Sequence, residues 1–303
     1  MRNFFSTVAV CSILGQGRFK ELGKAKIIRL FKIFGSKPPM SVAEWNAGGY
    51  QSISSLQEAI ATEQLARLTL GEHERILDLG CGHGKITAAI AQRVPQGSVL
   101  GVDASHNMIA FAQKNYGSPV HANLHFEVGN ARNLTYQHEF DRIVSFNALH
   151  WIPEQDAVLR SIRLALKPEG QALVRFVPEG ERECIEDVIE EVCKWPQWVG
   201  YFPNHQKPYF HPTPEAYRTR AQQNGLKVVR LQVEDKFWNF LTRQAFFEYC
   251  QVTLAEWTRF LPEREWAAFI TEILDRYQAL AADNPSENNT FKFYQMEVGL
   301  VPV

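Results

Sequence analysis

Short apolar runs alternate with helical patterns through the middle of the chain. The run R-I-L-D-L (75–79) precedes K-I-T-A-A-I-A-Q-R (85–93), and V-L-G-V-D (99–103) precedes S-H-N-M-I-A-F-A-Q-K (105–114). Apolar runs of this length suit strands buried on both faces, and the segments after them have the spacing of amphipathic helices. Strands that alternate with helices predict a parallel sheet with helices on both faces. We therefore expect a doubly wound α/β fold.

The pattern continues to the end of the chain. Strands are expected at 124–129, 140–146 and 171–176, and a helix at 52–68 precedes the first strand. The region of about 180–285 is rich in Trp, Tyr and Phe, which predicts a helical lid whose aromatic side chains are more often core than ligand contacts. Its elements and the last strand are expected at 214–223 (helix), 226–233 (strand), 243–260 and 263–282 (helices) and 291–301 (strand).

Three glycines spaced two apart follow the first strand, at Gly80, Gly82 and Gly84. Glycine permits positive φ and close approach of the backbone to a ligand, and a helix begins at once, so the loop N–H groups are expected to face that ligand. The second strand ends at Asp103, where a doubly wound fold places the carboxylate that accepts ribose hydroxyls. The two signals together predict a nucleotide-type cofactor.

The charge at the loop selects the kind of cofactor. Lys85 stands where a dinucleotide fingerprint has its third glycine, and Asp78 lies at the mouth of the loop. A carboxylate there would repel a pyrophosphate but attract an ammonium and a sulfonium. S-adenosylmethionine has both cations and no phosphate. Asp78, Gly80, Gly82 and Gly84 match acidic-x-Gly-x-Gly-x-Gly, so the chain resembles the class I S-adenosylmethionine-dependent methyltransferases.

The resemblance implies a mostly parallel, Rossmann-like seven-stranded sheet with a helical lid. It also implies that the turn at Asn130 and Ala131 holds the adenine, with the Asn130 side-chain oxygen accepting the exocyclic amine where the family often has aspartate. In this family the helix at 52–68 lies over the cofactor and carries substrate contacts. Tyr50, just before this helix, and Gln57 on it are the candidates for these substrate contacts. The alternative is that Tyr50 caps the edge of the core while Gln57 is solvated.

The end of the fourth strand reads N-A-L-H-W-I-P. Because ligands bind at the carboxyl ends of parallel strands, Asn147, Leu149, His150 and Trp151 are expected to face the methyl-donor end of the cofactor. The segment resembles the branch that methylates trans-aconitate and juvenile-hormone acid. His150 is interpreted as a general base or, with Trp151, as part of the pocket wall.

We expect methyl transfer to a small molecule, preferably to a carboxylate oxygen, which is ionised at pH 7 and needs no base. The alternatives are a phenol-O- or C-methyltransferase that uses His150 as base, and a protein that binds S-adenosylmethionine without catalysis. The chain has 303 residues, 45% of them hydrophobic, and a net charge of −1, which does not favour nucleic acid as the substrate. Its five cysteines form no C-x-x-C pair, so neither a disulfide framework nor a metal site is predicted, and a reducing, cytoplasmic compartment is the default.

Residues 1–39 differ from the rest, with eight Lys and Arg against one acid. Residues 19–34 form a basic amphipathic stretch of the kind that lies on anionic membranes, which suggests peripheral membrane contact. A flexible arm, or a true start at Met40, are the alternatives. The methyltransferase domain is expected to span 40–303.

Overall fold

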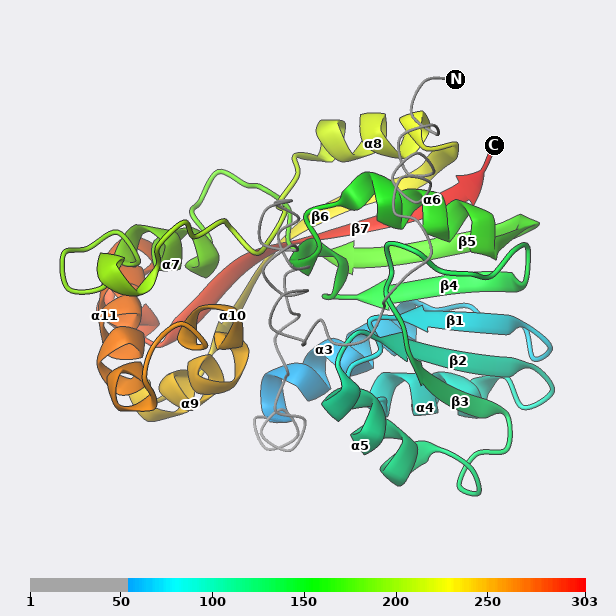
Figure 1. Ribbon diagram of the computed structural model, residues 1–303, viewed down its shortest axis with the longest axis horizontal. Coiled ribbons are helices and arrows are strands. Elements are labelled where there is room, and N and C mark those ends of the chain that lie inside the picture. The colour runs from blue at the N-terminus through cyan, green and yellow to red at the C-terminus, as the bar shows by residue number, and fades with distance from the viewer. Residues whose placement is uncertain (1–53) are drawn as a thin grey trace, which may run out of the picture. The chain divides into compact units, whose positions relative to one another are not determined.

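The computed structural model describes residues 54–303 (Figure 1). Five side chains at the beginning of the first helix are also outside the description, namely those of Ser54, Ser55, Gln57, Glu58 and Ala61. The arm at 1–39, Met40 and Tyr50 lie outside the described residues, so the expectations that concern them stay predictions. Within the described part of the chain, every helix is too short or too polar to cross a lipid bilayer.

Seven strands form one sheet in the order β3-β2-β1-β4-β5-β7-β6. The pairs β3–β2, β2–β1, β1–β4 and β4–β5 are parallel, whereas β7 is antiparallel to β5 and to β6. This architecture confirms the predicted fold. The bounds are β1 Arg75–Leu79, β2 Ser98–Asp103, β3 Leu124–Val128, β4 Phe140–Phe146, β5 Leu166–Phe176, β6 Leu226–Asn239 and β7 Thr290–Pro302.

Helices cover both faces of the sheet (Figure 1). On one face lie α3 (Ser54–Arg67), α4 (Lys85–Arg93) and α5 (His106–Tyr116), and on the other lie α6 (Gln155–Ala165) and α8 (Pro214–Gln223). Strand β1 is buried on both faces because its alternate side chains enter different cores: Ile76 packs with α4 and α5, while Leu77 and Leu79 pack with α6. The apolar run that predicted β1 is thereby explained.

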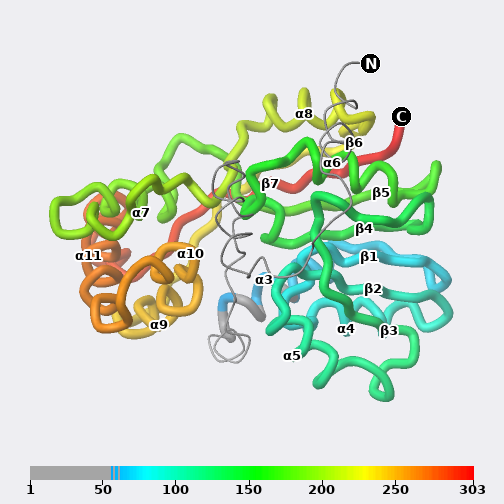
Figure 2. The backbone as a smooth tube through the Cα atoms, in the orientation of Figure 1, coloured from blue at the N-terminus to red at the C-terminus, as the bar shows by residue number. Residues whose placement is uncertain are grey.

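A helical cap is built around the outer ends of β6 and β7, which are paired as far as Asn239 and Thr290 (Figure 2). The cap has its own core, in which the predicted aromatic residues Trp198, Phe202 and Tyr209 are buried. Its elements are α7 Ile185–Val192, η2 Val199–Tyr201, α9 Arg243–Thr253, α10 Ala255–Thr258, α11 Glu263–Ala281 and η3 Pro285–Glu287. The single helix expected at 243–260 is wrong, because the backbone leaves the helix at Leu254. The expected lid range of 180–285 also contains α8, which packs on the sheet, and the inner part of β6, which is one of its strands.

A buried ionic cluster fixes α3 against the last three strands. Arg175 on β5 is 1% exposed, and its guanidinium lies 3.1 Å from Glu63 on α3, 3.6 Å from Glu234 on β6 and 3.5 Å from Glu297 on β7. Charges are removed from water only where opposite charges compensate them. The cluster therefore holds α3 at the carboxyl edge of the sheet, where ligands bind in doubly wound folds.

Candidate active site

The glycine loop after β1 has left-handed backbone at all three glycines, with φ of +78° at Gly80, +53° at Gly82 and +85° at Gly84. A Cβ at Gly80 would lie 2.2 Å from the Cβ of Ala148, and one at Gly84 would lie 2.8 Å from that of Ala112. A Cβ at Gly82 would meet no described atom within 4 Å. Gly80 and Gly84 thus allow close packing of the loop, whereas Gly82 borders open space that a ligand can enter.

The expectation that the loop N–H groups are left for the ligand is wrong for four of them. The N–H groups of Gly80 and Cys81 donate to the carbonyl of Val102, at 2.7 and 3.1 Å, and that of Gly84 donates to the carbonyl of Cys81. The Gly82 N–H donates to Oδ2 of Asp103 at 2.9 Å. Residues at the end of β2 thus accept the hydrogen bonds of the Gly80, Cys81 and Gly82 N–H groups, because β1 and β2 are adjacent in the sheet.

Asp103 is held by two backbone donors, since its Oδ1 also accepts from the Ser105 N–H at 2.9 Å. Ser105 in turn caps α5, because its hydroxyl accepts from the N–H of Met108. Each carboxylate oxygen can accept more than one hydrogen bond. Asp103 is therefore oriented at the end of β2, where the ribose hydroxyls are expected.

Asp78 is a buried carboxyl group, 2% exposed, that accepts from the Thr87 hydroxyl at 2.7 Å. Burial, followed by the charge of Asp103, raises the pKa of Asp78 to about 7. Among the described residues no cation pairs with it. A buried carboxylate without a cation is costly, so the position suits a ligand that brings positive charge. This fits a cofactor with an ammonium and a sulfonium.

The turn after β3 departs from the expected adenine contact. The Asn130 side-chain oxygen accepts from the backbone N–H of Arg132 at 3.0 Å and from its Nε at 3.1 Å. Both lone pairs of this oxygen are thus engaged, and Nδ2 is the group left for an adenine ring. Nδ2 donates a hydrogen bond, so it would meet a ring nitrogen rather than the exocyclic amine. Ala131 is buried beside it.

The end of β4 places Asn147, His150 and Trp151 beside one another. Asn147 has φ +54°, its N–H donates to the carbonyl of Arg175 at 2.8 Å, and its Oδ1 accepts from Gln295 at 2.9 Å. A 3-10 turn, Leu149–Trp151, follows. Asn147 is therefore fixed by the sheet and not free to move with a ligand.

His150 is 4% exposed, and its Nδ1 has no hydrogen-bond partner among the described residues. Burial, together with neighbouring His211 at 5.7 Å between ring centroids, holds the pKa of His150 well below its usual range. The imidazole is therefore neutral at pH 7 and a poor proton acceptor. The ring of Trp151 packs on that of His150, with 5.0 Å between the ring centroids. Trp151 also contacts Trp257 of the cap in an edge-to-face arrangement, with 5.8 Å between the centroids.

Tyr50 lies outside the described residues. Gln57 lies on α3, but its side chain is also outside the description. Their substrate contacts stay predictions.

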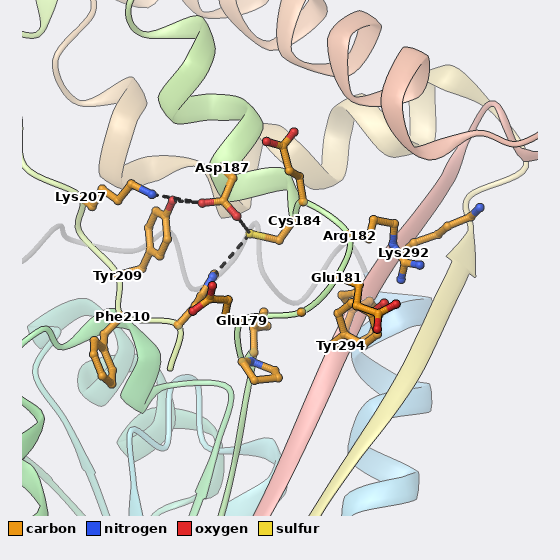
Figure 3. A pocket seen from close by; sticks show the side chains of 16 residues that line it. Glu179, Glu181, Arg182, Cys184, Asp187, Lys207, Tyr209, Phe210, Lys292 and Tyr294 are labelled. Carbon is orange, nitrogen blue, oxygen red and sulfur yellow. Dashed lines mark hydrogen bonds and ion pairs between the residues drawn. The ribbon is translucent and has the colours of Figure 1, made fainter. Parts of the chain in front are cut away.

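A pocket of 430 Å³ lies beyond the end of β5 and was not predicted from the sequence. Its wall comes from residues 177–184 and Asp187, from Lys207 and residues 209–211, and from residues 292–294 (Figure 3). The wall includes His211, the neighbour of His150. The acidic run E-G-E-R-E-C-I-E-D (179–187) was the one local signal for it. Acidic segments are common on solvated surfaces, so this signal does not by itself distinguish a pocket.

The family of the chain follows from comparison with known proteins. A model of a methyltransferase domain matches residues 70–225, which include the glycine loop, Asp103 and the end of β4. The chain belongs to this methyltransferase domain family. With the fold and the acidic glycine loop, this makes it an S-adenosylmethionine-dependent methyltransferase.

Particular relatives agree with this assignment. The chain is 27% identical to a putative methyltransferase, 235L, of Invertebrate iridescent virus 6, over 78% of this chain and 86% of that one. It is 26% identical to a trans-aconitate 2-methyltransferase of Shigella flexneri, over 82% of this chain and 93% of that one. A phosphoethanolamine N-methyltransferase of Haemonchus contortus, solved with S-adenosyl-L-methionine, shares the fold with a TM-score of 0.55 and 18% identity, over 85% of this chain and 57% of that one.

Proposed function

We propose that this enzyme methylates a carboxylate oxygen of a small acid that lies beside His150 and Trp151. The observation that carries the proposal is the state of His150, which is the titratable side chain at the end of β4. It is buried, and its pKa is held well below the usual range. A phenol or a carbon acid needs a base, whereas a carboxylate is already ionised at pH 7. The relatives named as trans-aconitate 2-methyltransferases support the same acceptor class.

Residues at the carboxyl ends of β1 to β4 would hold the cofactor. We assign Asp78 to its positive charge, Asp103 to the ribose hydroxyls, and Asn130 with Ala131 to the adenine. Gly82 borders the space the cofactor would enter, and Gly80 and Gly84 keep the loop compact. When bound, S-adenosylmethionine supplies an electrophilic methyl group on its sulfonium.

The protein's contribution to the chemistry is then position and exclusion of water. Asn147 is fixed by the sheet, the carbonyl of His150 accepts from the N–H of Phe210, and Trp151 packs against Trp257 of the cap. Aligning donor and acceptor contributes several kcal/mol to lowering a transfer barrier, roughly 7 or more in favourable cases. A wall of two indoles keeps water from the reacting oxygen. His150 acts in this proposal as a neutral part of the wall.

The test measures transfer of a labelled methyl group from S-adenosylmethionine to trans-aconitate as the first probe, followed by a panel of small acids. Label released by mild alkali identifies an ester. His150→Asn is expected to lower kcat less than about tenfold, with little change between about pH 6 and 8, because no proton leaves the acceptor. His125→Asn, a change at an exposed histidine on β3, is the matched control.

Three results would contradict the proposal. Alkali-stable label would indicate transfer to carbon, nitrogen or a phenolic oxygen. A loss of about a hundredfold in kcat in folded His150→Asn, with a neutral pH dependence that the change abolishes, would make His150 the base. A chain that binds the cofactor and transfers nothing to any acid of the panel would favour binding without catalysis.

A further inference from the structure

Three metal-ligating side chains meet beside the pocket beyond β5. Cys184, labelled in Figure 3, and Glu186 lie at the beginning of α7, and His211 comes from the segment before α8. One ligand atom of each lies within 4.8 Å of the others. Cys184 and Glu186 are buried, and His211 is partly buried. The fold thus brings the imidazole of His211 to a thiol and a carboxylate that lie together at a distant place in the sequence.

The distance between two of them has the value that zinc requires. Sγ of Cys184 lies 3.5 Å from Nδ1 of His211. Zinc binds sulfur at about 2.3 Å and nitrogen at about 2.0–2.1 Å in tetrahedral geometry, which separates two such ligands by about 3.6 Å. The separation of Cys184 and His211 is therefore compatible with one shared ion. One carboxylate oxygen of Glu186 lies within 4.8 Å of both atoms.

The charges around the cluster would also favour a cation. Glu186 is 8% exposed, and among the described residues no hydrogen bond or ion pair compensates its carboxylate. Buried carboxylates are normally paired or bound to a metal. The Cys184 thiol lies between Oδ2 of Asp187, at 3.1 Å, and Nδ1 of His211, at 3.5 Å. A divalent cation at this place would bring positive charge to both Glu186 and Asp187.

The cations of the pocket wall are engaged elsewhere. Arg182 pairs with Asp235, and Lys207 pairs with Asp187. Lys292 pairs with Asp283 and Glu287. None of these three pairs with Glu186 in the described part of the chain. The Lys and Arg side chains of the pocket wall therefore do not compensate the negative charge of Glu186.

We propose that Cys184, Glu186 and His211 form a zinc site. Thiolate and imidazole together favour zinc over magnesium and calcium, which take oxygen ligands. Binding would release the thiol proton to solvent, leaving Zn²⁺ with one thiolate, one carboxylate and one neutral imidazole. The fourth position would be taken by Asp187, whose Oδ2 lies 3.1 Å from Sγ of Cys184, or by water from the pocket. The ion would tie α7 to the segment that carries His211.

The experiment uses the untagged full chain, with zinc content measured after dialysis and Co²⁺ as a spectroscopic substitute. We expect about one zinc per chain and a thiolate-to-cobalt charge-transfer band. Cys184→Ser should abolish that band, and both Cys184→Ser and His211→Gln should weaken zinc binding at least tenfold. Cys193→Ser, a change at another buried thiol of the cap, is the matched control and should alter neither measurement.

The result that would overturn the site is a wild-type chain that takes up no stoichiometric zinc or shows no thiolate band with Co²⁺. Zinc affinity that is unchanged in folded Cys184→Ser would have the same meaning. If Cys184→Ser fails to fold, the cobalt spectrum of the wild-type chain decides thiolate ligation, and Glu186→Gln tests the carboxylate. These measurements do not depend on methyl transfer.

Discussion

The glycine loop and the helical cap are both closely packed, but different forces specify them. In the loop the backbone itself is constrained, because a Cβ at Gly80 would lie 2.2 Å from that of Ala148. In the cap the constraint is burial of large side chains such as Trp257 and Phe269, both fully buried. Apolar cores tolerate many combinations of side chains, whereas a left-handed, crowded backbone position tolerates only glycine. The loop is therefore recognisable as a motif and the cap is not.

Their buried carboxyl groups differ as well. In the cap, Glu190 accepts from Nε1 of Trp257 at 2.8 Å and lies 2.8 Å from Nε2 of His205. These partners hold the pKa of Glu190 below its ordinary value despite burial. Asp78, just before the loop, accepts a hydrogen bond from the Thr87 hydroxyl and pairs with no cation among the described residues. Its pKa is raised. Glu190 is thus compensated within the cap, whereas Asp78 has no cation beside it in the described part of the chain.

The largest effect is expected within the loop, between two of its glycines. Gly80→Ala should destabilise the protein by about 3–5 kcal/mol, because left-handed strain adds to the collision with Ala148. Gly82→Ala should cost only about 1 kcal/mol, since its Cβ meets no described atom, but it should weaken cofactor binding by filling ligand space. Urea unfolding and calorimetry measure the two quantities. Equal stability of the two variants would mean that packing does not distinguish these positions.

A smaller effect separates the loop from the cap. Asp103→Ala should weaken S-adenosylmethionine binding by about 1.5–3 kcal/mol, roughly ten- to a hundredfold, because charge-assisted hydrogen bonds to the ribose are lost. Ile273→Val in the core of the cap should cost about 0.5–1.5 kcal/mol of stability and leave the affinity unchanged. Calorimetric titration of both variants provides the comparison. Full affinity in a folded Asp103→Ala enzyme would remove this carboxylate from the site.

The smallest effect per pH unit is the contribution of Asp78 to the pH dependence of stability. The pKa of Asp78 is raised to about 7, so between about pH 4, where a free aspartate titrates, and pH 7 the folded state holds a proton that the unfolded state has released. Stability should therefore fall as pH rises, by about 1 kcal/mol between about pH 6 and 7. The depressed pKa of His150 acts in the opposite direction, and it cancels when wild type is compared with Asp78→Asn. Parallel stability curves for the two proteins, measured by urea unfolding at several pH values, would contradict the assignment.

Several elements could be predicted because their signals are local. The helix at 214–223 begins after a capping threonine with proline at its first position and has the predicted bounds. Strands β1 and β2 were predicted from apolar runs, the first of which leads into the glycines while the second ends at Asp103. The break at Leu254 was missed because apolar spacing continues across it. A change of direction caused by packing leaves no local signal when no glycine or proline marks it.

The sequence by itself determined the class of the protein, since the acidic glycine loop and Asp103 are short-range patterns whose backbone requirement can be recognised from residue type. Tertiary structure decided which groups remain available. It engaged the loop N–H groups with Val102 and Asp103, and it buried His150 beside His211. It also joined Cys184 to a histidine 27 residues away. Hydrogen-bond partners, burial and charge compensation depend on segments that are distant in the chain, so they follow from packing and not from local pattern.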